Sequence, residues 1–266
     1  MNVTFIEFGD HLASSRLRAK IPQKEVAKYG VKKGSDVIVY GKHWLEPSEL
    51  DRFGKKVFDV CDNHYDSPDV GSYYYLHTIQ ADVVTCNSEE MRKVIKSKTG
   101  RDAIVIPEPY ESPERRPSIG ETLLWFGHAS NLKDLQRLQS ELKHKLVVMT
   151  NGVGIPWSRE NFAKLMEKPL IVIIPTGKSM AKSENRMVES IRNGKYVCAE
   201  HLPAYEPFSP WMPTGNIPQH VERVLETPQA AIQSILAAQD YIRDKYSPET
   251  IGRQWLEVIN GAAKLY

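Results

Sequence analysis

The segment from residue 169 to residue 208 constrains the fold of this chain most, because a strand, a helix and a second strand follow one another within it. The apolar run Leu170–Ile174 has the length of a buried strand, and Tyr196–Ala199 is a second such run. Between them, Ser183 is a suitable N-cap for a helix that Gly194 would end. A strand–helix–strand order is typical of a parallel sheet, so the segment predicts an α/β fold.

Polar side chains give this expected helix a candidate ligand face. Lys182, Asn185 and Glu189 follow at steps of three and four, so they lie on one side, and Arg186 borders them. A helix N-terminus attracts phosphate through its free N–H groups and its dipole, and a carboxylate further along can accept hydrogen bonds from sugar hydroxyls. The pattern therefore fits a nucleoside diphosphate, and an ordinary solvated face with i,i+4 pairs is the alternative.

Length and composition bound the remaining classes. The 266 residues have room for two domains of roughly 120 residues each. A net charge of +2 gives no support for nucleic-acid binding by charge alone. The widely spaced Cys61, Cys86 and Cys198 fit no metal site or disulfide framework, so we expect buried free thiols in a reducing, cytoplasmic setting. We expect no secretion signal, because the N-terminal stretch MNVTFIEFGD lacks a basic region followed by an apolar one. We expect no membrane-spanning segment, because no apolar run approaches 18 residues.

The alternation of strands and helices continues along the whole chain. We expect further strands at 3–8, 36–40, 55–61, 81–86, 104–106, 122–126 and 146–150. We expect further helices at 22–30, 71–81, 88–98, 132–143, 157–166, 217–226, 228–245 and from 248 onward. The proline-rich stretch 107–120 is the best linker candidate. This predicts a first domain over 1–117, a second over 118–245, and a last helix over 246–266.

Polar residues follow two of the expected strands in the first half. Ser15, Arg16 and Arg18 would lie in the loop after the first strand, and Asp62 and His64 follow the strand at 55–61. In open α/β sheets the loops after the carboxyl ends of the strands form the ligand crevice, so these residues are candidates for an anionic ligand and for acid–base chemistry. Ordinary surface arginines and a merely polar histidine in a turn are the alternatives.

Taken in order, these motifs resemble those of the GT-B retaining glycosyltransferases, the group that includes glycogen synthase and many bacterial sugar transferases. The resemblance is carried by Lys182-Ser183, Asn185-Arg186, Glu189-Ser190 and Gly194, and by the stretches SSRLRA, FDVCDNHYD, ADVVTCNS and TLLWFG. It implies two Rossmann-like domains whose parallel sheets face a central cleft, and a last helix, 246–266, that crosses back to the first domain. One residue departs from the pattern: many members carry a second glutamate eight positions before the one that matches Glu189, where this chain has Ala181.

The resemblance also implies roles for individual residues. The Glu189 equivalent binds the nucleotide ribose, and Lys182 would stabilise the leaving phosphate. Donor-binding residues would be Gly127, His128, Asn131, Lys133, Ser183, Asn185, Arg186 and Glu189. Asp62 and His64 would point at the donor sugar or the acceptor hydroxyl, and Ser15, Arg16 and Arg18 at the acceptor.

The implied activity is transfer of a hexosyl or pentosyl group from a nucleotide diphosphate sugar to a hydroxyl group, with retention and without a metal or other cofactor. The acceptor would be a glycan or polysaccharide precursor, or a hydroxymethylated DNA base as in phage enzymes. A catalytically silent nucleotide-sugar binding module is one alternative. A nucleotide-sugar epimerase is another, although the cluster of acid–base residues that such enzymes carry around the donor is not evident in the sequence.

Overall fold

The computed structural model describes residues 1–9, 12–42, 45–177 and 179–264. The chain forms two compact units. Unit 1 consists of Met1–Glu111, Ala181–Ser183 and Lys245–Tyr266, and unit 2 consists of Ser112–Met180 and Glu184–Asp244. The three residues 181–183 thus belong to unit 1, although the residues before and after them in the sequence belong to unit 2.

Unit 1 contains a parallel sheet whose five strands follow one another in chain order. They are β1 (Asn2–Phe5), β2 (Lys32–Tyr40), β3 (Lys55–Val60), β4 (Val83–Cys86) and β5 (Ile104–Val105). Every neighbouring pair is parallel, with Phe5 opposite Val39 and Val60 opposite Cys86. Among the described strands of unit 1 the order therefore never reverses.

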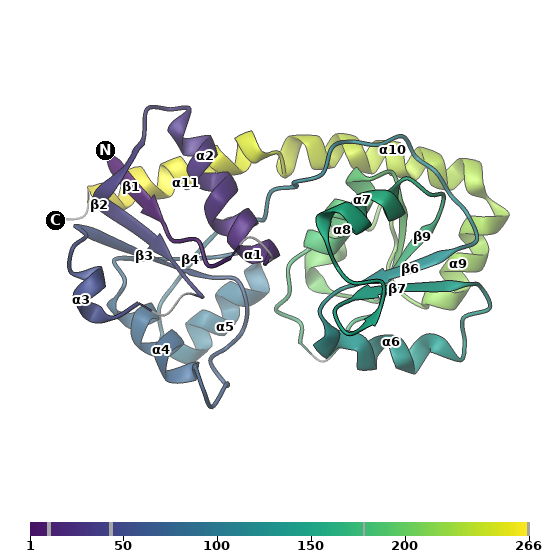
Figure 1. Cartoon of the computed structure of the whole chain (residues 1–266), viewed down its shortest axis with the longest axis horizontal. Coiled ribbons are helices and arrows are strands. Elements are labelled where there is room, and N and C mark those ends of the chain that lie inside the picture. Colours follow the sequence, from purple (N-terminus) through teal and green to yellow (C-terminus); the bar gives the residue numbers. More distant parts are fainter. Residues whose placement is uncertain (10–11, 43–44, 178, 265–266) are drawn as a thin grey trace. The chain divides into compact units, whose positions relative to one another are not determined.

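The alternation of side chains along these strands builds two cores. Val37 and Val39 of β2 point to one face, which is covered by α2 (Ile21–Ala27) and α11 (Pro248–Ala263). Ile38 and Tyr40 point to the other face, which is covered by α4 (Gly71–Gln80) and α5 (Glu89–Thr99). Figure 1 shows α2 and α11 on one side of the sheet and α4 and α5 on the other. Both faces are apolar because a parallel sheet covered by helices on both sides meets no water.

The segment before α2 differs from the prediction. Ser15, Arg16 and Arg18 were expected in a loop, but they lie in the short helix α1 (Ala13–Ser15) and the π-helical segment η1 (Arg16–Lys20). The Ile21 N–H bonds to the carbonyl of Arg16, five residues back, just before Pro22, whose ring nitrogen has no hydrogen to donate. The loop prediction was wrong because this stretch contains no helix breaker and buries Leu17 and Ala19 in addition to both arginines.

Unit 2 contains a second sheet, with the strand order β10-β9-β6-β7-β8. Its strands are β6 (Leu123–Phe126), β7 (Leu146–Thr150), β8 (Val153–Gly154), β9 (Ile171–Ile174) and β10 (Tyr196–Ala199). All pairs are parallel except β7 with β8. The predicted α/β fold with two mainly parallel sheets is confirmed.

The strand order of unit 2 reverses at β6. Helix α6 (Leu132–Gln139) leads from β6 to β7 on one side, whereas α8 (Asn185–Arg192) leads from β9 to β10 in the opposite direction across the sheet. Right-handed crossovers then place the two helices on opposite faces, as Figure 1 shows. In open α/β sheets, ligands bind beyond the carboxyl ends of the two strands that flank such a reversal, which are β6 and β9 here.

Several helix termini follow from local sequence. Ser88 caps α5, accepting a hydrogen bond from the Met91 N–H at 3.2 Å, as predicted. Gly194 ends α8 with a φ of +70°, also as predicted. The predicted cap at Ser183 is wrong, because Glu184 is the N-cap of α8 and the Ser183 hydroxyl bonds elsewhere in unit 1.

The remaining elements connect the sheets. They are α3 (Pro47–Leu50), η2 (Ala129–Asn131), α7 (Arg159–Met166), η3 (Pro203–Phe208), α9 (Ile217–Glu226) and α10 (Pro228–Lys245). Helices α9 and α10 have the predicted bounds, whereas α3, η3 and β8 were not predicted. None of the described helices is both long and apolar enough to cross a membrane.

Candidate functional site

The turn after β6 opens directly at the strand-order reversal of unit 2. A Cβ atom added to Gly127 would lie 3.3 Å from the Trp125 ring and 3.5 Å from the Arg186 guanidinium. A larger residue would therefore crowd the base of the turn. Without a side chain at Gly127, a ligand can approach the backbone of this turn closely.

The predicted polar residues of this turn lie on or near the surface of unit 2. His128 is exposed and caps η2, its Nδ1 lying 2.9 Å from the Ser130 hydroxyl and accepting the Ser130 N–H at 3.3 Å. Lys133 is exposed, in the first turn of α6, and Asn131 is half-buried just before it. Three of the predicted donor residues therefore lie together just beyond the carboxyl end of β6.

Helix α8 brings Arg186 to the same place. Its guanidinium lies 3.5 Å from the Phe126 carbonyl oxygen at the end of β6, and it donates a hydrogen bond to the Tyr205 hydroxyl of η3. Burial raises the pKa of Tyr205, so this hydroxyl stays protonated and accepts from the guanidinium. Asn185 is half-buried beside Arg186, and Glu189, one turn further, is only 5% exposed.

The N-terminus of α8 already carries a carboxylate. Glu184, its N-cap, is 5% exposed, and a negative charge there offsets the positive end of the helix dipole. Arg186 and Lys133 are the predicted donor residues of unit 2 that carry a positive charge.

In unit 1, Asp62 and His64 follow β3 as predicted. Asp62 forms an ion pair with Lys42, which follows β2. The His64 ring packs against the Tyr74 ring with centroids 5.1 Å apart, and burial lowers its pKa. His64 is therefore a neutral imidazole at pH 7, the form that can accept a proton.

The three predicted acceptor-binding residues are buried and bonded within unit 1. Arg18 donates to both carboxylate oxygens of Asp59, at 2.9 and 2.6 Å, and also to the Ile106 carbonyl. Arg16 donates to both carboxylate oxygens of Glu111, at 2.8 and 2.6 Å. Ser15, 1% exposed, accepts the N–H of Phe8 at 2.9 Å. The arginines thus hold the chain segment from residue 106 to residue 111.

Residues 181–183 pack into unit 1. Ala181 is 7% exposed and belongs to the apolar cluster on the α4–α5 face of the sheet. The Ser183 hydroxyl donates to Glu108 Oε2 at 2.7 Å. Lys182, between Ala181 and Ser183 in the sequence, is half-buried. The position at which many GT-B members carry the second glutamate is therefore a small apolar contact here.

Glu108 is a candidate site residue that was not predicted from the sequence. It follows β5, is 6% exposed, and its pKa is raised by burial, although Arg18 and the hydrogen bonds from Ser183 and Asn87 offset part of the rise. A glutamate flanked by two prolines shortly after a parallel strand was the available signal. Among the described residues, no group of three or more His, Cys, Asp or Glu side chains is arranged to hold a metal ion.

Comparison with known proteins identifies the fold. No protein-family model matches the chain, and no curated protein sequence matches it significantly. Among solved structures, Anabaena HepE bound to UDP and glucose superposes with a TM-score of 0.67 at 15% identity, over 94% of this chain and 84% of HepE. The two sheets are those of the GT-B fold.

Two further structures resemble the chain at similar identity. A glycosyltransferase from Rickettsia africae has a TM-score of 0.62 at 14% identity, over 98% of this chain and 85% of that protein. S. aureus TarM has a TM-score of 0.56 at 14% identity, over 84% of this chain. The match spans about half of TarM, 54% of its length. The resemblance to the GT-B fold predicted from sequence is confirmed.

Proposed function

We propose that this chain is a GT-B glycosyltransferase that moves a sugar from a nucleoside diphosphate sugar to a hydroxyl acceptor. One observation carries the proposal: the strand order of unit 2 reverses at β6, where Gly127 and Arg186 meet. Other doubly wound sheets bind nucleotides at the edge where the strand order reverses. HepE, which has the same fold, was solved with UDP-glucose, and this supports the choice of ligand.

In this proposal unit 2 binds the donor. Glu189 accepts hydrogen bonds from the ribose hydroxyls, and Asn185 and Asn131 lie beside the phosphates. Arg186 and Lys133 supply positive charge to the phosphates, and Lys182, which precedes α8 in the sequence, is proposed to stabilise the leaving phosphate. Side-chain cations that face the leaving diphosphate stabilise its charge as the glycosidic bond breaks, so the proposed reaction requires no metal.

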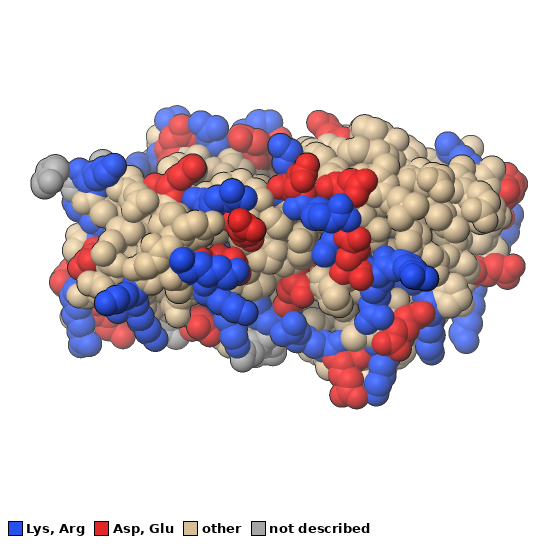
Figure 2. Space-filling view, turned by 90° about the horizontal axis from the view of Figure 1, so that it is seen from above, with Lys and Arg blue, Asp and Glu red and all other residues tan. Residues whose placement is uncertain are grey.

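The acceptor is proposed to bind at unit 1, near Asp62 and His64. The resemblance implies retention of configuration, with a donor phosphate oxygen helping to remove the acceptor proton. A glycan precursor is favoured over a DNA base, because the net charge of the chain is only +2, and lysines and arginines are interspersed with carboxylates on the one face that Figure 2 shows. Direct acceptor binding by Arg16 or Arg18 would require their carboxylate partners to be released.

A nucleotide-sugar binding module without transferase activity is the second candidate. The observation that favours it is Ala181, whose small apolar side chain packs into unit 1 where many relatives carry a glutamate near the sugar. Binding without transfer would need the donor-binding residues and neither Asp62 nor His64. Turnover, rather than affinity, therefore separates the two candidates.

The test begins with thermal shift against UDP, GDP and ADP. A nucleotide at 100 times its Kd stabilises the folded chain by about 2.7 kcal/mol, so the correct one is readily recognised. Its sugar conjugates are then incubated with candidate acceptors, and products are identified by mass spectrometry. Lys182→Ala should lower turnover at least about 100-fold, whereas Lys168→Ala, an exposed lysine before β9, should not change it.

The outcomes separate the proposals. Nucleotide release with a glycosylated product supports the transferase. Stabilisation by a nucleotide without any turnover supports the binding module. Lack of stabilisation by every nucleotide, or full activity of Lys182→Ala, would contradict the corresponding part of the proposal.

A further inference from the structure

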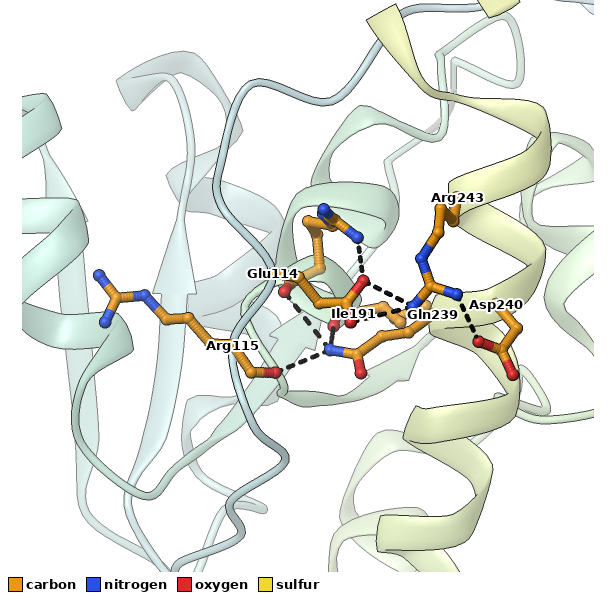
Figure 3. Close-up of polar contacts among 7 residues, drawn as sticks. Glu114, Arg115, Ile191, Gln239, Asp240 and Arg243 are labelled. Carbon is orange, nitrogen blue, oxygen red and sulfur yellow. Dashed lines mark hydrogen bonds and ion pairs between the residues drawn. The ribbon is translucent and has the colours of Figure 1, made fainter.

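The C-terminal end of α8 is held by a side chain from α10. A helix leaves its last four carbonyl groups without partners in the helix itself. Gln239 of α10, 2% exposed, donates from Nε2 to the Ile191 carbonyl at 2.9 Å and to the Arg115 carbonyl at 2.9 Å (Figure 3). One amide group therefore joins α8, α10 and the linker that follows unit 1 in the sequence.

An ion-pair network surrounds this amide. Glu114 of the linker forms ion pairs with Arg192 at the end of α8 and with Arg243 of α10 (Figure 3). The Arg243 guanidinium lies 3.0 and 2.9 Å from the two carboxylate oxygens of Glu114. Arg243 also donates to Asp240 at 2.8 Å. Glu114 is one-third exposed and Arg243 half exposed, so each of these pairs contributes little by itself. The network restrains the linker over Gln239.

Backbone bonds fix the register of the linker against the end of α8. The Arg115 N–H donates to the Arg192 carbonyl at 3.0 Å, and the Ser118 N–H donates to the Gly194 carbonyl at 3.0 Å. Gly194 has a φ of +70°, and an added Cβ would collide with the Arg116 carbonyl. The helix end cannot shift without breaking several of these contacts.

Glu189 lies close to this anchored end. It precedes Ile191 by two residues, about 3 Å along the helix axis. The Glu189 carbonyl accepts the Asn193 N–H at 3.1 Å and the Asn193 side-chain amide at 2.8 Å. A rotation or slip of the last turn would therefore move the Glu189 carboxylate with it.

We propose that Gln239 is a positioning residue for the nucleotide site: it holds α8 in the register at which Glu189 meets the nucleotide ribose. This inference rests on the proposed function. Gln239 itself touches no ligand in this account. A buried leucine would be cheaper to desolvate than an amide, but it would supply no directed hydrogen bonds. The two directed donors fix the rotation and height of α8, which apolar packing alone leaves less defined.

The experiment compares three variants with the wild-type chain. Gln239→Leu removes both donors at similar size, and Gln239→Glu replaces the donating nitrogen by an oxygen. Gln233→Leu changes an exposed glutamine of the same helix and is the matched control. The probe is whichever of UDP, GDP and ADP most raises the wild-type Tm, and its Kd is measured by calorimetry. Hydrogen exchange of α8 is followed in parallel, with β7 as the internal reference.

Gln239→Leu should raise the nucleotide Kd at least tenfold and speed exchange in the last turn of α8, while β7 exchange stays unchanged. The KM for the sugar nucleotide should rise in parallel, and kcat should change less than threefold. Gln239→Glu should bind weakly at pH 8 and recover at pH 5.5, because the protonated acid can donate one hydrogen bond to the Ile191 carbonyl. Gln233→Leu should bind as the wild type does.

An unchanged Kd in Gln239→Leu, with exchange in α8 accelerated, would overturn the positioning role while leaving the proposed function intact. The same holds if kcat falls and KM does not change. Failure of the wild-type chain to bind any of the three nucleotides would overturn the proposed function and this inference with it. The two failures are therefore distinguishable from the wild-type titration alone.

Discussion

Replacing Arg18 by methionine tests whether this arginine is a structural residue of unit 1 or a ligand-binding one. Its side chain is 2% exposed, and that of its partner Asp59 is 6% exposed. The guanidinium also lies 5.2 Å from the centre of the Trp255 ring. Methionine retains much of the length of the arginine side chain but leaves the Asp59 carboxylate buried, with the Thr85 hydroxyl as its remaining hydrogen-bond donor among the bonds described.

The magnitude follows from the burial of this pair. Removing one partner of a buried, hydrogen-bonded ion pair costs about 3–5 kcal/mol, because the other charge stays desolvated. The double variant Arg18→Met with Asp59→Asn has no stranded charge. It should be destabilised by less than the sum of the single variants, with a coupling of about 2 kcal/mol or more.

Hydrogen-exchange mass spectrometry reads the free energy of opening in each unit separately. Peptides from β3 report on unit 1, and peptides from β9 serve as the internal control in unit 2. We expect the loss of protection to be confined to unit 1. A change below about 1 kcal/mol in β3, together with loss of sugar transfer, would refute the structural role and restore Arg18 as an acceptor-binding residue.

Three further predictions test other parts of the structure. Gly194→Ala should destabilise unit 2 by more than Gly152→Ala does. Both glycines have a positive φ, but of the two only Gly194 has a carbonyl where its added Cβ would lie. Thermal denaturation compares the two variants, and an equal loss of stability would contradict this prediction. Burial lowers the pKa of Lys195 to about 8, below its unfolded value of 10.5. The unfolding free energy of the wild type, relative to that of Lys195→Met, should therefore rise with pH between about 8 and 10.5, by at most about 1.4 kcal/mol per pH unit. Urea titrations measure this difference, and parallel pH curves for the two proteins would rule it out. Burial raises the pKa of Glu108, so the stability of the wild type relative to Glu108→Gln should be greatest near pH 4 and should decline as pH rises through the folded pKa. An opposite trend in urea titrations would show that the folded state stabilises the carboxylate form instead.

The sequence predicted the two sheets because parallel strands buried on both faces are runs of valine, isoleucine and leucine. The run Leu170–Ile174 became β9, and Tyr196–Ala199 became β10. Helices with local boundary signals were also predicted well. Asn216 caps α9 and Pro228 begins α10, and both helices have the expected bounds.

Contacts between residues distant in sequence could not be predicted in this way. Ser183 was expected to cap α8, but its hydroxyl bonds to Glu108, 75 residues earlier. Arg18 was expected to face a ligand, but Asp59, 41 residues away, neutralises it. Hydroxyl and guanidinium groups bond equally well to many partners, so local spacing cannot choose among them.

The candidate donor site was likewise predicted only in part. The residues that follow β6 and begin α8 were predicted, because a glycine after a strand and a polar helix face are local patterns. The hydrogen bond from Gln239 to the C-terminal end of α8 was not predicted, because Gln239 is 48 residues from Ile191 and is one of several glutamines in α10. The strand-order reversal that selects this edge of the sheet is a property of strand pairing and is visible only in the structure.

The most direct test of the account is a crystal structure of the chain with the nucleoside diphosphate that stabilises it most. The account predicts the diphosphate beyond the carboxyl ends of β6 and β9, next to the Gly127 turn and Arg186, with a ribose hydroxyl donating to the Glu189 carboxylate. A nucleotide bound elsewhere on the chain, with Glu189 contacting no part of it, would contradict the central claim.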